Sequence, residues 1–354
     1  MPTTTGERML SPRLILWLFI VYCLIPLCTY ADSAPSTSPI AFFDTEPILP
    51  IPPATGLDAA KIALGQRLFH DVRLSQHQAR SCATCHRVDH GGDDGRPRSL
   101  AAGDRLYPRN TPTIFNVALN TRYNWDGNQR TLEATSEAAL LSPDKMAANW
   151  SGLLAKLKST ADDVAAFKAI YREEPSREHV LDALVAYQRS LLTPNSRFDQ
   201  YLRGRRDALT EAEKQGYQLF KAYGCAACHQ GVNAGGNMFQ KFGIVPTDKP
   251  PRDHDADDPG RFAITGMARD QRVFRVPSLR NVGVTAPYYH DGRVDTLAGA
   301  VDLMARRQLG KVLVSKEVEL IVQFLHTLTG TYQGKVLSQT PPPSPPQTQK
   351  DTSS

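Results

Sequence analysis

The feature that most constrains this chain is a five-residue pattern, Cys-x-x-Cys-His, that occurs twice. The copies are Cys82-Ala83-Thr84-Cys85-His86 and Cys225-Ala226-Ala227-Cys228-His229. Each copy places two thiols and one imidazole within a single turn of chain. This spacing is the attachment signature of c-type haem, in which both thiols bond to the porphyrin and the histidine ligates the iron.

Two other chemistries use paired cysteines. Zinc takes four ligands that two such pairs can supply, but here each pair already has its own histidine and the pairs lie far apart in the chain. Two of the six cysteines, Cys23 and Cys28, lie in an apolar N-terminal run that is typical of a cleaved leader. Disulfides would suit an exported protein with the four that remain, although cysteines this close together are more often redox or metal sites. We therefore predict two covalently bound haem c groups.

The first 31 residues have the pattern of a secretory signal peptide. Arg8 and Arg13 form a basic region, Leu14–Cys28 is an almost unbroken apolar run, and Ala31 ends a small-residue cleavage site. The run is short for a membrane span, so an uncleaved anchor is the weaker alternative. A periplasmic location agrees with the haem prediction, because bacteria attach c-type haem outside the cytoplasm.

The strongest periodic patterns in the 354 residues are helical. An apolar stripe follows Ser176, a capping box begins at Thr210, and another apolar stripe ends near Gly330. Alternating strand patterns are scarce, which predicts a mostly α fold with long loops. The formal net charge is +5 without a basic stripe, and nothing favours nucleic-acid binding.

Several motifs recur in the same order in both halves of the chain. Gly-x-x-Leu-Phe precedes each haem motif, with x standing for different residues, and Pro112–Gly127 has the same length as Pro277–Gly292. This recurrence predicts a duplicated unit, with one copy in each half of the chain. The predicted divisions are a signal peptide (1–31), an extended segment over the surface (32–56), a haem 1 domain (57–200), a haem 2 domain (201–334) and a disordered Pro-rich tail (335–354).

The repeat also indicates how the two irons differ. Met304 follows Gly292 at a position that matches Ala139 in the first half. If Met304 is the sixth ligand of haem 2, haem 1 has only a methyl group there and is open on that face. A His/Met iron suits electron transfer, whereas an open iron can bind a small oxidant. The alternative for Met304 is a buried core methionine.

Taken together, the motifs resemble those of the bacterial di-haem cytochrome c peroxidase family, which includes MauG, the enzyme that matures methylamine dehydrogenase. The resemblance covers about residues 57–332. The segments that carry it are 64–75, 109–113, 125–127, 276–281, 286–292 and 308–310. It implies two cytochrome c-like domains, related by internal duplication, with a calcium ion at their interface. It also implies an oxidoreductase in which haem 1 is the peroxidatic group and haem 2 the electron-transfer group.

The resemblance implies roles for single residues as well. Asn110, Thr285 and Pro287 fall on the family's calcium ligands, which are an asparagine side chain and two backbone carbonyls. Trp125 falls on the tryptophan between the two haems, which can relay an electron, and Met304 falls on the sixth ligand of haem 2. The alternatives are a turn residue for Asn110 and a core aromatic for Trp125.

The first haem departs from the family pattern. The loop histidine of reductively activated peroxidases aligns with Ala102, the distal glutamate with Lys145 and a distal glutamine with Thr135. A protonated lysine cannot accept the proton that the glutamate moves between the peroxide oxygens. Three interpretations of Lys145 stay open: a solvated lysine in a pocket rearranged around Asp144 or Glu137, a buried neutral amine that acts as base or iron ligand, or loss of peroxide chemistry.

Three functions follow from these predictions. The first is an exported peroxidase that reduces hydrogen peroxide at haem 1, with electrons from a small c-type cytochrome or copper protein arriving through haem 2 and Trp125. The second is a MauG-like oxidase that modifies a side chain of a partner protein, which Ala102 favours. The third is a non-enzymatic electron carrier or sensor. The resemblance leaves a homodimer open.

Overall fold

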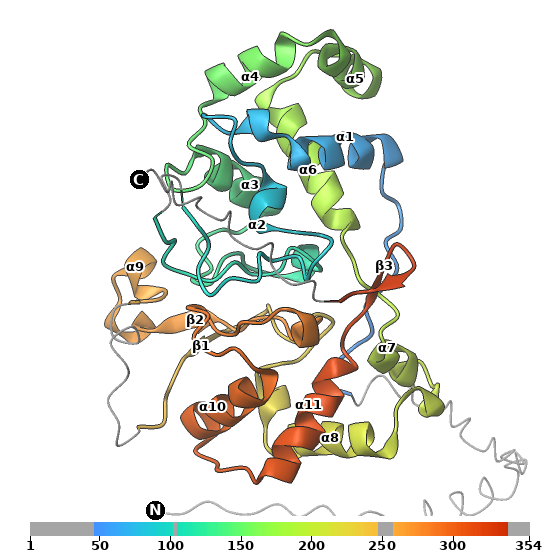
Figure 1. Ribbon diagram of the computed structural model, residues 1–354, viewed down its shortest axis with the longest axis vertical. Coiled ribbons are helices and arrows are strands. Elements are labelled where there is room, and N and C mark those ends of the chain that lie inside the picture. The colour runs from blue at the N-terminus through green and yellow to red at the C-terminus, as the bar shows by residue number, and fades with distance from the viewer. Residues whose placement is uncertain (1–45, 102–104, 247–257, 339–354) are drawn as a thin grey trace, which may run out of the picture. The chain divides into compact units, whose positions relative to one another are not determined.

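The computed structural model describes residues 46–101, 105–246 and 258–338. The predicted signal peptide, Ala102 and residues 339–354 lie outside these ranges. The described chain is mainly helical, with two small two-stranded sheets, which confirms the predicted mostly α class (Figure 1). No helix within the described ranges combines the length and the apolar character needed to cross a bilayer.

The α-helices are α1 (Ala59–His70), α2 (Cys82–Cys85), α3 (Leu132–Leu141), α4 (Trp150–Lys158), α5 (Ala161–Tyr171), α6 (Arg177–Ser190), α7 (Arg197–Leu202), α8 (Glu211–Ala222), α9 (Phe262–Thr265), α10 (Leu297–Leu309) and α11 (Ser315–His326). The strands are β1 (Phe239–Lys241), β2 (Val273–Arg275), β3 (Thr331–Tyr332) and β4 (Lys335–Val336), and both sheets are antiparallel.

Local capping explains where the predicted helices begin. The Ser176 hydroxyl accepts the amide of His179 at the start of α6. At the start of α8, Thr210 and Glu213 form the predicted capping box, in which each side chain accepts the other residue's amide. These bonds satisfy backbone donors that have no partner inside the helix.

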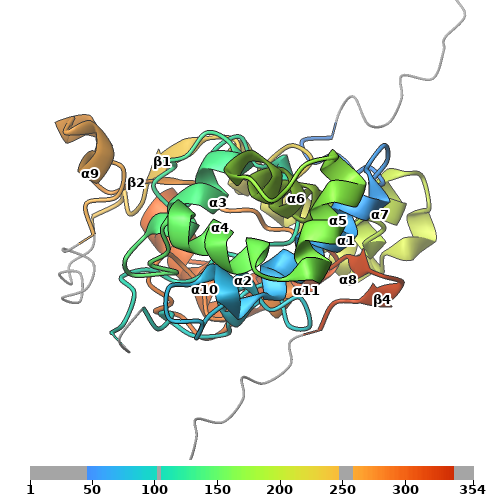
Figure 2. The same ribbon diagram turned by 90° about the horizontal axis from the view of Figure 1, so that it is seen from above.

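Two helix pairs form the centres of two hydrophobic clusters. Helix α1 packs on α6 in the first cluster, and α8 packs on α11 in the second. Gly65 and Gly216 allow the close approach, because a Cβ added at either would lie 1.9 Å from a backbone oxygen, that of Ala183 or Leu320. Figure 2 shows α4 and α5 next to α1 and α6, on the first cluster.

The segment before α1 packs in the second half of the chain. Ile48 and Ile51 are fully buried, and Ile48 belongs to the second cluster. The Arg280 guanidinium donates to the Leu49 carbonyl at 2.6 Å, and the Ile51 amide donates to Asp199 at 3.2 Å. The prediction that this segment runs over the surface is therefore wrong at these isoleucines, because their burial completes a distant core.

The chain after α11 returns to the first half. Strands β3 and β4 form a hairpin, and the Tyr332 ring lies 5.1 Å from that of Phe115 in the first cluster. Leu337 also packs on this cluster. The predicted disordered tail therefore begins too early at residue 335, since Lys335–Val336 is a paired strand.

A buried threonine joins matching turns of the two halves. Asn116 and Asn281 both have left-handed backbone, with φ of 58° and 64°. Their side-chain amides donate to the hydroxyl of Thr193, at 2.7 Å and 3.0 Å respectively. Each asparagine precedes a short 3-10 helix, Val117–Leu119 or Val282–Val284. These turns lie in the loops that carry the predicted site residues Asn110, Trp125, Thr285 and Pro287.

Candidate functional site

The second Cys-x-x-Cys-His motif follows directly from the end of α8. Gly224, with φ of 86°, turns the chain into the 3-10 helix Cys225–Ala227, and the His229 amide then donates to the Cys225 carbonyl at 3.0 Å. This single turn gathers the two thiols and the imidazole. All four cysteines in the described ranges are free thiols, so no disulfide competes for them there.

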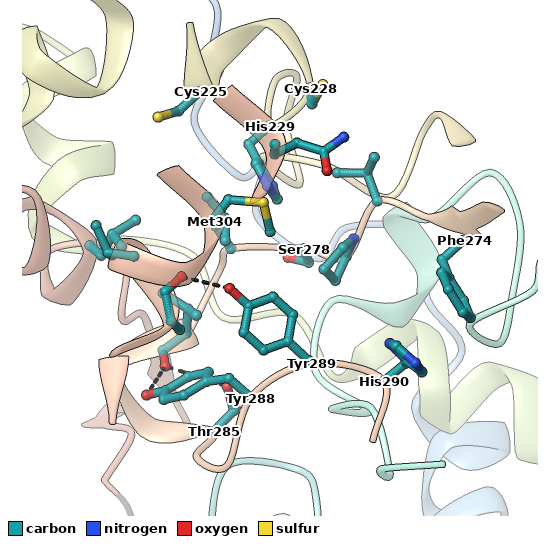
Figure 3. Close-up of a pocket in the computed structure, with 18 of the residues that line it drawn as sticks. Cys225, Cys228, His229, Phe274, Ser278, Thr285, Tyr288, Tyr289, His290 and Met304 are labelled. Atoms are coloured by element: carbon teal, nitrogen blue, oxygen red, sulfur yellow. Dashed lines mark hydrogen bonds between the residues drawn. The ribbon is translucent and has the colours of Figure 1, made fainter. Parts of the chain in front are cut away.

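Cys225, Cys228 and His229 line a cavity together with Met304, which lies on α10. Figure 3 shows the Met304 thioether and the His229 imidazole pointing towards each other. The rest of the wall is mainly apolar and includes Phe220, Leu279, Leu297, Val301 and Leu325. The structure thus brings the predicted haem 2 residues together around one apolar space.

The protonation states of the side chains that line this cavity suit a haem group. His229 is buried, and burial lowers its pKa to about 4 against a smaller opposing effect of the Ala234 and Pro277 carbonyls. A neutral imidazole is the form that ligates iron. Arg275 places a buried cation in the same wall, where it donates to the neutral oxygens of Asn124 and Asn120. The donor set and this cation fit an iron porphyrin that carries anionic propionates.

The first motif forms the short helix α2. Its N-cap Ser81 donates its amide to the Thr84 hydroxyl at 2.9 Å, which closes the turn. His86 Nδ1 lies 3.3 Å from the Gly92 carbonyl oxygen. Burial lowers the pKa of His86, and the charge of Lys145 lowers it further, so this imidazole is also neutral. Burial raises the pKa of the Cys82 thiol to about 12.

The charge of Lys145 acts on His86 and Cys85 of this first motif. This lysine follows α3 in a loop, is half-buried, and holds its ammonium 5.3 Å from the centre of the Tyr107 ring. Burial raises the pKa of Cys85, whereas the Lys145 charge acts in the opposite direction. The Thr135 hydroxyl is engaged elsewhere, because it donates to the Thr131 carbonyl at the start of its own helix at 2.7 Å.

The two carboxylates considered as replacements for the distal glutamate have other partners. Asp144 pairs with Arg105 at 2.6 Å. Glu137 pairs with Arg177 at 2.6 Å, which lowers its pKa, and accepts the Trp150 indole N–H at 2.8 Å. Each carboxylate is therefore held by a cation other than Lys145, and the geometry gives no support to a pocket rearranged around them.

Trp125 and the predicted calcium ligands lie along the same cavity as the haem 2 residues. The Trp125 indole donates to the Asn110 carbonyl at 2.9 Å, and the Asn110 amide donates to the His290 carbonyl at 2.7 Å. The Asn110 side-chain nitrogen donates to the Arg96 carbonyl at 2.8 Å, so its side-chain oxygen is the atom that could bind a cation. Thr285 and Pro287 line this cavity too, so the three oxygen-bearing residues and Trp125 are brought together.

The sequence alone did not identify His290 as a residue that lines this cavity. Its imidazole stacks on Phe274, with ring centroids 4.2 Å apart, and burial lowers its pKa to about 4. Arg109 lies nearby, where it pairs with Asp126 at 2.7 Å and Asp258 at 2.8 Å. The repeat could have identified His290, because this residue occupies the place of Trp125 in the second half.

Comparison with known proteins places the chain among di-haem enzymes. Residues 59–207 match the family model described as di-haem cytochrome c peroxidase. The chain is 43% identical to cytochrome c peroxidase Ccp of Escherichia coli strain K12 over 288 residues, which are 81% of this chain and 62% of that protein. This chain therefore spans less than two thirds of that relative.

Two further relatives are covered more fully. Cytochrome c551 peroxidase of Pseudomonas aeruginosa is 41% identical over 271 residues, which are 75% of this chain and 78% of that protein. The crystal structure of a MauG-like protein associated with microbial copper homeostasis matches with a TM-score of 0.68 and 30% identity, over 79% of this chain and 92% of that one. This chain belongs to the di-haem cytochrome c peroxidase family.

Proposed function

We propose that the protein reduces hydrogen peroxide at haem 1 with electrons that a small redox protein delivers to haem 2. The observation that carries the proposal is the shared cavity, in which Cys225, His229 and Met304 lie along the same walls as Trp125 of the other half. The peroxidase names of the relatives support the same reaction.

The residues present divide the work between the two sites. Haem iron, when bound, supplies one-electron redox chemistry, and a peroxide that takes up two electrons and two protons leaves as two waters. His86 would hold the first iron, while His229 and Met304 would hold the second. Trp125 would connect the sites, since its ring meets His290 and its indole N–H is fixed by Asn110. The Lys145 ammonium would donate a proton at Nζ.

Several finer assignments belong to the same proposal. The Asn110 side-chain oxygen and the Thr285 and Pro287 carbonyls would bind a calcium ion. The matching turns at Asn116 and Asn281 support an internal duplication with domains at 57–200 and 201–334. We also propose export by the predicted signal peptide to the periplasm, with a small c-type cytochrome or copper protein as donor.

The MauG-like oxidase is the second candidate, and one observation favours it. The match to the MauG-like structure covers 92% of that chain at 30% identity. In this function the two sites would store two oxidising equivalents and take electrons from a side chain of a partner protein.

A stoichiometric peroxide experiment separates the candidates. The purified holoprotein is mixed with one equivalent of peroxide, with and without a reduced c-type cytochrome, while optical and EPR spectra are recorded. Repeated oxidation of the donor supports the peroxidase, whereas a long-lived oxidised state without donor turnover supports the MauG-like role. No spectral response would contradict both and leave an electron carrier or sensor.

A further inference from the structure

Tyr289 reaches the turn of α10 that carries Met304 (Figure 3). Its hydroxyl donates a hydrogen bond of 2.6 Å to the carbonyl oxygen of Ala300. In an α-helix the carbonyl of residue 300 also accepts the amide of residue 304. Burial raises the pKa of the Tyr289 hydroxyl, and the backbone N–H of Met304 acts in the opposite direction. The phenol oxygen therefore lies next to the helical hydrogen bond between the Ala300 carbonyl and the Met304 amide.

Tyr289 is held through its backbone and through its ring. Its backbone has φ of 74°, a left-handed conformation that is unfavourable for an aromatic residue and persists only where the surroundings fix it. The ring packs on Phe242, with centroids 5.1 Å apart, and its carbonyl accepts the Gly292 amide at 3.2 Å. Phe242 itself lines the cavity. The hydroxyl is thus presented to α10 by a fixed ring.

The neighbouring tyrosine makes a different contact. The Tyr288 hydroxyl donates to the Val282 carbonyl at 3.1 Å, in the 3-10 helix that follows Asn281. Both tyrosines lie in the same loop and donate to a backbone carbonyl, but the Tyr288 bond goes to Val282 and not to α10. This difference makes Tyr288 a matched control.

We infer that Tyr289 is a positioning residue for Met304, because its hydroxyl fixes the turn of α10 from which the thioether faces His229. This inference rests on the proposed assignment of Met304 as the sixth ligand of haem 2. Loss of the hydroxyl would leave the Ala300 carbonyl with its helical partner alone and allow the turn to shift. A single hydrogen bond corresponds to about a 2- to 10-fold change in the equilibrium between ligated and displaced methionine.

The test is an imidazole titration of the oxidised holoprotein. It is followed at the long-wavelength charge-transfer band of methionine-ligated ferric haem, which reports haem 2 alone. In Tyr289→Phe the imidazole concentration that removes half of the band should fall about 2- to 10-fold, and the reduction potential of haem 2 should shift. Tyr288→Phe should match the wild type. A Tyr289→Phe curve that overlays the wild type would overturn the inference, and so would equal effects of the two substitutions.

Met304→Ala separates this inference from the proposed function. If Met304 is the ligand, this variant lacks the band from the start. A band that survives in Met304→Ala would overturn both the ligand assignment and the role of Tyr289. A band that is lost in Met304→Ala but unaffected by Tyr289→Phe would overturn the role of Tyr289 alone.

Discussion

The Trp125 indole and the His290 imidazole meet edge to face, with ring centroids 6.3 Å apart and planes inclined by 69°. The two residues hold matching places in the two halves, since each is followed by Asp-Gly. His290 in turn stacks on Phe274. A continuous row of aromatic rings therefore runs from a residue of the first half to residues of the second, along the cavity that holds Met304.

Replacement of Trp125 by phenylalanine should slow electron delivery without changing haem 2. The variant loses the readily oxidised indole and its bond to the Asn110 carbonyl. We expect the rate of donor oxidation by peroxide to fall about tenfold, which corresponds to about 1.4 kcal/mol in the activation barrier. The measurement is steady-state oxidation of a reduced c-type cytochrome, with the charge-transfer band recorded on the same sample.

Trp150→Phe is the matched control for this prediction. Trp150 is also in the first half and also donates its indole N–H, in this case to Glu137 at 2.8 Å. Its replacement should leave donor oxidation near the wild-type rate. Equal slowing by the two substitutions would show that the loss is one of packing.

Replacement of Lys145 by glutamate should increase peroxide reduction. A carboxylate can take a proton from one peroxide oxygen and return it to the other, and positioned acid-base catalysis contributes about 100-fold or more. We therefore expect kcat/KM for peroxide to rise about 100-fold in Lys145→Glu. Lys168→Glu is the control, because it reverses the charge of an exposed lysine on α5 that pairs with Glu174. An unchanged, measurable kcat/KM in Lys145→Glu would show that residue 145 does not limit proton transfer, whereas no turnover in either protein would argue that the first site has lost peroxide chemistry.

The two close helix contacts make a prediction about stability. Gly65→Ala or Gly216→Ala would place a Cβ 1.9 Å from a backbone oxygen, so that the paired helices must separate. We expect each substitution to lower the free energy of unfolding by about 3 kcal/mol or more. Gly152→Ala in α4 meets only the Asn149 side chain, at 3.3 Å, and should stay within about 1 kcal/mol of the wild type. Chemical denaturation of the holoprotein measures all three.

The parts of the fold that could be predicted depend on bonds between near neighbours. The starts of α6 and α8 follow from Ser176 and from Thr210 with Glu213, because each cap closes within three residues. The burial of Ile48 and Ile51 could not be predicted in this way, since it depends on a core built by helices far along the chain. A Pro-rich composition around these residues suggested a surface segment instead.

The candidate site shows the same division. The motif cysteines and histidines could be predicted because haem attachment needs them within one turn of chain. Met304 lies in the same cavity as His229, where its distance from Gly292 and the family resemblance together led us to expect it. The role of Tyr289 could not be predicted, because it depends on which loop packs against α10. The sequence pattern is silent on that contact.

His290 should make stability depend on pH. Burial holds its pKa at about 4 in the folded protein, against about 6.5 in an unfolded chain. Between these values the unfolded chain binds a proton that the folded protein does not, so the free energy of unfolding falls as the pH falls. From about pH 7 to about pH 4.5 this contribution amounts to about 2.5 kcal/mol.

His290→Asn should remove that contribution, although it also loses the stacking on Phe274 and lowers stability at neutral pH. The informative quantity is therefore the difference in unfolding free energy between the two pH values, which should shrink by about 2.5 kcal/mol in the variant. His77→Asn, at an exposed position, should leave the difference unchanged. If His290→Asn keeps the wild-type difference, the acid sensitivity must come from the protonation of other buried groups. The imidazole beside Trp125 would then bind its proton equally well in the folded and the unfolded protein.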